Sequence, residues 1–229
     1  TATSSQLVWT YSLDFSSLSL SDGSYNVTVT GDDYAGNAYA GTDSFTLTVD
    51  TTGPNISNYR ISTSNATNTL AKLSDTVTLT FDVSETVSGV TVDDVQFALT
   101  NASTDTTAYA NATAISFTGT GTVHAGFVLT ETNTNYAGYN VQWKVDPSGF
   151  EDLNGNAASG LNTNTFVDSN SDQIIYDNKA PTLSTVAILS NNFDTSKAND
   201  GNIISINITG SEDITLQTSS VTILGSNSS

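Results

Sequence analysis

A pentapeptide that occurs twice organises the chain. Asp50-Thr51-Thr52-Gly53-Pro54 recurs in altered form as Asp177-Asn178-Lys179-Ala180-Pro181, at an offset of 127 residues. The apolar positions that follow keep the same offset without a gap, so that Ile61 corresponds to Ile188 and Leu79 to Ile206. Such self-similarity indicates tandem structural units. Because proline fixes its own φ and pushes the preceding residue to an extended conformation, each pentapeptide is predicted to be a joint between units.

Strict alternation of apolar and polar residues predicts strands with one buried face. The chain of 229 residues has no Met, few Lys and many Thr, a composition that favours strands over helices. The expected strands are Gln6–Thr10, Tyr11–Leu18, Tyr25–Thr30, Ser44–Val49, Ile56–Ser62, Thr76–Val83, Val90–Leu99, Val123–Thr130, Tyr139–Val145, Asn162–Val167, Gln173–Tyr176, Thr182–Leu189, Ile203–Ile208 and Ser220–Leu224.

A turn at Asp22-Gly23-Ser24 directly precedes Tyr25. This start resembles the tyrosine corner of immunoglobulin-like sandwiches, where a Tyr at the start of strand F bonds to upstream backbone. We therefore predict an all-β chain of tandem immunoglobulin-like (Ig-like) Greek-key β-sandwiches, one complete and two partial. Residues 1–52 are the C-terminal part of one domain, 53–180 a complete, enlarged domain, and 181–229 the N-terminal part of a third. The extra length of the complete domain is expected in 100–122 and 157–172.

Three motifs occur in a fixed order, and two of them recur. Asp-Gly-x-Tyr is followed by Asp-x-x-Gly-Asn, at 33–37 and 152–156, and then by Asp-Thr-Thr-Gly-Pro; Ser-Glu follows a strand at 84–85 and 211–212. The series resembles the tandem Ig-like (cadherin-like) repeats of large prokaryotic cell-surface proteins, such as surface-layer (S-layer) proteins and giant adhesins. The resemblance implies an extracellular location, in an S-layer, in a cell wall or secreted. It implies calcium-stiffened rods or lattices and no enzyme. The implied partners are further Ig-like domains of the same polypeptide and neighbouring copies in a homo-oligomeric assembly.

In a Greek-key sandwich the start of strand A, the B–C loop and the F–G loop share one pole. Acidic and amide side chains occupy these three places, and mixed carboxylate and carbonyl oxygens are the ligands that Ca²⁺ prefers. Like charges gathered without a cation would repel one another. The predicted ligands are Asp50, Glu85, Asp152, Asn154 and Asn156 for the complete domain, with Asp22 arriving from the preceding one, Asp177 and Glu212 for the third, and Asp32, Asp33 and Asn37 for the first. The alternative is that Asp-x-x-Gly-Asn is only a turn, because Asp, Gly and Asn all favour turns.

The charge of the chain restricts its partners. There are 23 acidic and 5 basic residues, which give a net charge of -18. This charge repels nucleic acid and anionic membranes and attracts small cations. Without cysteine there are no disulfides, and no apolar run is long enough for this segment to insert into a membrane. His124 is the only histidine, so the sequence argues against a His-based zinc site or a catalytic dyad.

We therefore predict a non-enzymatic structural module of an extracellular S-layer-type lattice with cation-stiffened joints. Two alternatives remain open: stalk repeats of a bacterial adhesin, and an accessory Ig-like module of a secreted glycosidase or protease. Glycosylation is possible at Asn65, Asn101 and Asn111, which are sequons in polar stretches, although sequons are no more frequent here than chance predicts.

Overall fold

The computed structural model describes residues 12, 14, 17–39, 41, 44–101, 107–146, 149–159, 165 and 167–214. The expected strands Gln6–Thr10, Tyr11–Leu18, Asn162–Val167 and Ser220–Leu224 lie wholly or largely outside these residues. The chain divides into two compact units, each of which is described by itself. One comprises residues 1–130 and 138–176, and the other 131–137 and 177–229.

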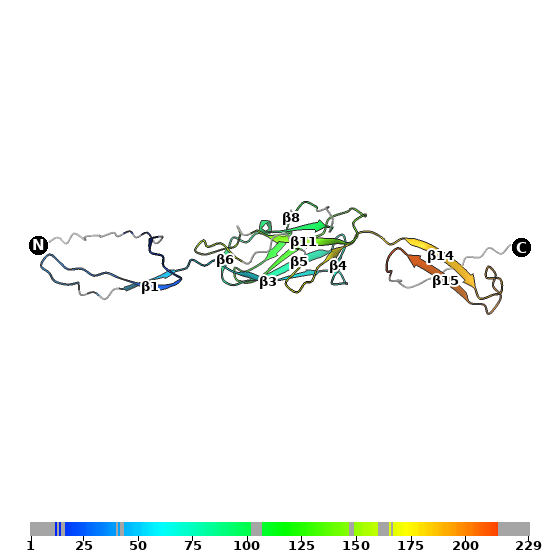
Figure 1. Ribbon diagram of the computed structural model, residues 1–229, viewed down its shortest axis with the longest axis horizontal. Coiled ribbons are helices and arrows are strands. Elements are labelled where there is room, and N and C mark those ends of the chain that lie inside the picture. The colour runs from blue at the N-terminus through cyan, green and yellow to red at the C-terminus, as the bar shows by residue number, and fades with distance from the viewer. Residues whose placement is uncertain are drawn as a thin grey trace. The chain divides into compact units, whose positions relative to one another are not determined.

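The first unit contains a β-sandwich of two sheets (Figure 1). One sheet has the strand order β3 (Ile56–Thr63), β5 (Thr76–Val83), β10 (Gly121–Val128) and β9 (Ala114–Ser116). The other has the order β4 (Leu70–Ala71), β13 (Ile175–Tyr176), β11 (Tyr139–Val145), β7 (Val95–Thr100) and β8 (Ala110–Asn111). All pairings are antiparallel except β4 with β13. The predicted fold class, an all-β Ig-like sandwich, is confirmed.

The core lies between the two sheets. Its residues follow from the alternation of apolar and polar side chains along each strand. On β5 the buried residues are Val77, Leu79, Phe81 and Val83, and on β11 they are Tyr139, Val141, Trp143 and Val145. Because successive side chains of a strand point to opposite faces, each strand gives every second residue to the core. The Trp143 ring stacks on Tyr59 of β3 at 4.9 Å between centroids. Trp143 is therefore a core residue.

The expected bounds agree with the structure on β2, β5 and β11, and on most other expected strands they differ by one or two residues. The segment Val90–Leu99 divides into a 3₁₀ turn, η2 (Val92–Asp94), followed by β7. Thr91 caps this turn, because its side chain accepts from Asp93 N and the Asp94 carboxylate accepts from Thr91 N at 2.6 Å. The short pair β6 (Val87–Ser88) and β12 (Glu151–Asp152) ties together the loops that follow β5 and β11.

A hairpin of β1 (Gly23–Thr28) and β2 (Ser44–Val49) precedes the sandwich in the chain. Tyr25 pairs with Leu47, and its hydroxyl donates to the carbonyl of Ser21 at 2.8 Å. This is the upstream backbone bond that the resemblance to a tyrosine corner predicts. The hairpin therefore begins as a strand F of an Ig-like domain begins.

The second unit contains the hairpin of β14 (Leu183–Ser190) and β15 (Ile204–Gly210), which repeats β3–β5. Ile188 pairs with Ile206 as Ile61 pairs with Leu79. Both hairpins shift register near the start of their first strand. Ser211 also exchanges two hydrogen bonds with Thr182, as Ser84 does with Asn55. The sequence offset therefore marks a repeat of structure.

Candidate metal site at the joint segment

The joint segment, Asp50–Pro54, is packed against the sandwich through its backbone. Pro54 is buried, and its carbonyl accepts from Ser159 N at 2.8 Å. A Cβ on Gly53 would lie 1.9 Å from the carbonyl oxygen of Ala157. Only glycine permits so close an approach, so residues 157–159 fix the position of Asp50 at the start of the segment.

A closed loop after β11 holds Asp152 in place. Its Oδ1 accepts from the backbone N–H groups of Asn154 and Asn156, each at 2.8 Å, and its Oδ2 accepts from the Asn156 side-chain amide at 2.8 Å. Gly155 has a φ of 87°, which glycine adopts without strain. Burial by itself would raise the pKa of Asp152, but the hydrogen bonds from Asn156, Asn154 and Gly155 outweigh it and lower the pKa. The loop thus presents an ionised carboxylate in a fixed orientation.

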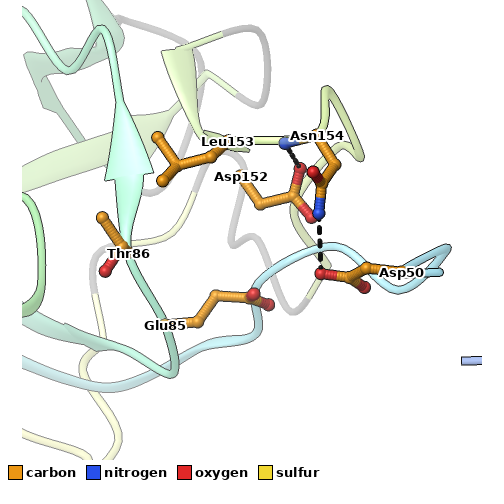
Figure 2. A pocket seen from close by; sticks show the side chains of 6 residues that line it. All are labelled: Asp50, Glu85, Thr86, Asp152, Leu153 and Asn154. Carbon is orange, nitrogen blue, oxygen red and sulfur yellow. Dashed lines mark hydrogen bonds between the residues drawn. The ribbon is translucent and has the colours of Figure 1, made fainter. Parts of the chain in front are cut away.

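Three carboxylates converge where the joint segment meets this loop. Oxygens of Asp50, Glu85 and Asp152 lie within 4.8 Å of one another, and among the described residues no other three acidic or histidine side chains come so close. Figure 2 shows them around one pocket of about 250 Å³, also lined by Thr86, Leu153 and Asn154. We call these three carboxylates the joint cluster. The structure thus brings together three side chains that are far apart in the sequence.

The two predicted amide ligands act as hydrogen-bond donors in this arrangement. The Asn154 side chain donates to Asp50 Oδ2 at 3.1 Å, and the Asn156 side chain donates to the Asp50 carbonyl at 3.1 Å. Asp50 Oδ1 accepts from Thr52 N at 3.2 Å. The amides therefore connect the joint segment to the loop, and the carboxylates are the oxygen groups that converge.

The joint cluster concentrates negative charge around Glu85. Burial is the largest influence that raises the pKa of Glu85, and the charges of Asp50, Asp152 and Asp22 raise it further. The folded protein therefore keeps a proton on Glu85 at a pH where the unfolded chain has released it. Stability conferred by that proton is present at acidic pH and is lost as the pH rises above the ordinary value of 4.5.

We accordingly expect Glu85→Gln to be more stable than the unchanged protein at neutral pH when divalent cations are chelated. The neutral amide removes the repulsion with little change in shape. Below pH 4.5 the difference should shrink, because Glu85 is then protonated. Urea unfolding in chelator at both pH values measures this. Equal stabilities at neutral pH would contradict an electrostatic penalty at Glu85.

Asp22, a predicted ligand, binds the joint segment instead of joining the cluster. It accepts from Thr51 N at 2.7 Å and from the Thr51 hydroxyl at 2.6 Å, and the Thr52 hydroxyl also donates to it. The hydrogen bonds from Thr51 and Thr52 lower the pKa of Asp22. The sequence prediction missed both threonines, although two adjacent hydroxyls in the pentapeptide were a visible signal.

The sites predicted for the other two domains are described in part. Asp177 Oδ1 accepts from Lys179 N at 2.9 Å, the bond that Asp50 makes with Thr52. Within the described part of the chain, Asp177 and the exposed Glu212 belong to no group of three carboxylates. The third-domain site remains a prediction.

The Asp33 loop, which belongs to the predicted first domain, has the same hydrogen bonds as the Asp152 loop. Asp33 Oδ1 accepts from Ala35 N and Asn37 N, each at 2.8 Å, and Oδ2 accepts from the Asn37 side chain at 2.8 Å. These bonds, that of the Asn37 side chain first, lower the pKa of Asp33. Asp32, Asp33 and Asn37 line one shallow pocket. Ala35 stands where the other loop has Asn154, so this loop has no side-chain amide at that position.

A third loop of this type, at 168–172, was not anticipated from the sequence. Asp168 Oδ1 accepts from Asn170 N at 2.7 Å and from Asp172 N at 3.0 Å, while Oδ2 accepts from Ile61 N at 3.1 Å. Ser171 has a φ of 69° and takes the place of the glycine in the other two loops. Because Ser stands where the other loops have Gly, the sequence of this loop does not match the Asp-x-x-Gly-Asn motif. The loop contacts β3 next to the point where the register of β3 shifts.

The three predicted glycosylation acceptors each use the side-chain nitrogen in a hydrogen bond. Asn65 donates to Asp75 at 2.7 Å and Asn101 to the Tyr139 hydroxyl at 3.2 Å, and Asn111 donates to Asp93. His124 is exposed on β10. These side chains lie outside the joint cluster.

Residues 9–111 match the family model of the bacterial Ig-like domain (group 3). The match runs across the joint segment, from before β1 to β8. No curated protein and no solved structure matches the chain significantly. The family match supports an Ig-like repeat of bacterial surface proteins, a class of module that is structural and generally non-catalytic. Within the described segments, no helix is long and apolar enough to cross a membrane.

Proposed function

We propose that the chain is a structural module of an extracellular surface assembly of the S-layer type, whose joint segment is stiffened by bound Ca²⁺. Its task is mechanical: it holds successive Ig-like domains at a fixed spacing and angle. The observation that supports this proposal is the joint cluster, in which Asp50 of the joint segment meets Glu85 and Asp152 of two sandwich loops.

The chemistry of the cluster suits a hard cation. Ca²⁺ takes about six to eight oxygen ligands in flexible geometry, and carboxylates are common among them. Asp152 Oδ2 accepts one hydrogen bond, and each Asp50 oxygen accepts one from Thr52 or Asn154, so each keeps a lone pair for a metal. A cation would also offset the repulsion that raises the pKa of Glu85. Protons and Ca²⁺ would therefore compete at this residue, and affinity should fall at acidic pH.

A cation in this place would act on the joint and not only on the sandwich. Asp50 begins the joint segment directly after β2, whereas Glu85 follows β5 and Asp152 ends β12. An ion bound by all three carboxylates favours the state in which the joint segment is docked. Ligand that binds only this state stabilises it by RT ln(1 + [L]/Kd), or about 2.7 kcal/mol at a 100-fold excess over Kd.

We expect millimolar Ca²⁺ to raise the melting temperature of the full chain and a chelator to lower it. Mg²⁺ should do less, because it requires near-octahedral geometry and gives up water reluctantly. Glu85→Gln should remove most of the calcium-dependent rise. Asp146→Asn is the matched control, since Asp146 is exposed and does not line the pocket. Calorimetry of the unchanged chain and of both variants in Ca²⁺, Mg²⁺ and chelator measures these effects, and a melting temperature that does not change with Ca²⁺ would contradict the proposed site.

The stiffening of the joint segment by Ca²⁺ can be measured separately from the melting temperature. The chain has no cysteine, so Thr46→Cys on β2 and Ser116→Cys on β9 give two unique exposed spin-label positions. The label-to-label distance distribution should narrow when Ca²⁺ is added and broaden in chelator. A distribution that stays broad in saturating Ca²⁺ would show that the ion binds without stiffening the joint.

A further inference from the structure

The hairpin β14–β15 exposes a face that its structural repeat buries. Ile188 is 64 % exposed, whereas Ile61 at the equivalent position of β3 is 7 % exposed. Ile208 is 43 % exposed, and its counterpart Phe81 is fully buried. Cross-strand pairing places Val186 opposite Ile208 and Ile188 opposite Ile206, so these side chains share one face. An apolar strip of this kind marks an interaction surface.

The sandwich shows what covers such a face. Tyr59 of β3 stacks on Trp143 of β11, and Phe81 of β5 packs edge-on against Phe150 at 5.6 Å. The cover is therefore the sheet that contains β11, and β11 begins Tyr139-Asn140-Val141. A face with the register of β3–β5 is complementary to a strand of this type.

The hairpin β1–β2 has the features of that cover. Its first strand contains Tyr25-Asn26-Val27, and the loop after it repeats the hydrogen bonds of the Asp152 loop. Its pairing puts apolar side chains on one face, with Tyr25 opposite Leu47 and Val27 opposite Phe45. Phe45 is 66 % exposed. Within the residues that the structure describes, the chain thus carries both a face without a cover and a hairpin of the covering type.

We propose that β1–β2 of one copy docks on the β14–β15 face of a second copy, so that the two hairpins form parts of one sandwich. The two surfaces differ, so the contact is head-to-tail and links successive copies into chains or closed rings. The inference deepens the structural role proposed above and rests on it. The two can fail separately, because calcium-dependent melting tests the joint and self-association tests the hairpins.

Sedimentation velocity on the full chain tests the proposal. The experiment needs about 0.15 M salt, where the Debye length is about 8 Å, because copies of net charge -18 repel one another. The expected result is an average mass that grows with concentration. Ile188→Asp and Phe45→Asp should each lower the association constant at least about tenfold, since each buries an unpaired charge in the contact. Leu189→Asp is the matched control, because Leu189 is exposed on the opposite face of β14.

Mixing the two variants tests whether β1–β2 of one copy docks on β14–β15 of the other. A chain with Ile188→Asp keeps β1–β2 intact, and a chain with Phe45→Asp keeps β14–β15 intact, so an equimolar mixture should form dimers that do not extend. Near-ultraviolet circular dichroism of buried Trp143 confirms that the sandwich stays folded in each variant. A full chain that is monomeric at all concentrations would overturn the proposal. Association that Phe45→Asp leaves unchanged would also overturn it, since the β14–β15 faces would then pair with each other.

Discussion

Replacing Trp143 with Ala should lower the free energy of unfolding of the sandwich by about 3–5 kcal/mol. Trp143 is fully buried on β11, and its ring stacks on Tyr59 across the two sheets. The truncation removes this contact and leaves a cavity that two hydrogen-bonded sheets cannot close by a small movement. Chemical denaturation followed by far-ultraviolet circular dichroism measures the loss, with the midpoint shifting and the slope nearly unchanged.

Trp143→Phe separates packing from hydrogen bonding at this position. The indole Nε1 is buried and has no hydrogen-bond partner among the described residues. Removing it therefore leaves no protein acceptor unsatisfied, and Phe keeps an aromatic ring beside Tyr59. We expect Phe to cost much less than Ala. Similar losses for both substitutions would show that the indole N–H contributes an interaction of its own.

The regular strands of the sandwich could be predicted because one physical constraint sets both their pattern and their bounds. On Thr76–Val83 and Tyr139–Val145 every second side chain is apolar, and the structure has β5 and β11 with these limits. The repeat was also visible, because Ile61 and Leu79 need apolar counterparts at Ile188 and Ile206 for the pairing to recur. Periodicity succeeds where one face of a strand packs and the other is solvated.

Some features of the structure do not follow from the alternation of apolar and polar residues. They arise from hydrogen bonds of individual polar side chains, either to neighbouring backbone or to residues far away in the sequence. Thr91 and Asp94 turn the start of an expected strand into a 3₁₀ turn through their own hydrogen bonds. Asp168 reaches Ile61 N, more than 100 residues earlier, which no local pattern reveals. Asp22 likewise acquires its role only because the hairpin places it against Thr51.

The joint cluster was predicted by topology and not by a local motif. Asp50, Glu85 and Asp152 converge because a Greek-key sandwich puts the joint, the turn after β5 and the loop after β11 at one pole. Which side chains of the site present oxygen atoms and which donate hydrogen bonds could not be predicted from the sequence. Whether an amide such as Asn154 offers oxygen or nitrogen depends on which group it faces, and here it faces the Asp50 carboxylate and donates.

Substituting Gly53 should undock the joint segment and weaken both stability and the response to calcium. The nearest neighbours of a Cβ at this position are backbone atoms, Ala157 O at 1.9 Å, Ala157 C at 2.6 Å and Asn156 O at 3.0 Å. No rotamer change relieves such a clash, so Gly53→Ala should cost about 1–3 kcal/mol through backbone displacement. Because Asn156 also donates to the Asp50 carbonyl, the displacement should move Asp50 away from Glu85 and Asp152.

Gly126→Ala is the control, since its Cβ would meet Thr76 and Ala114 only at ordinary contact distances of 3.8 and 3.9 Å. Within β10 this substitution should be neutral or slightly stabilising, because Ala loses less backbone entropy on folding. Urea unfolding of the three proteins with Ca²⁺ and with chelator separates the two effects. We expect Gly53→Ala to be destabilised in chelator and to gain little from Ca²⁺, while Gly126→Ala keeps the full gain. If Gly53→Ala responds to Ca²⁺ as the unchanged chain does, the cation does not depend on the docked joint, and its ligands lie on the sandwich alone.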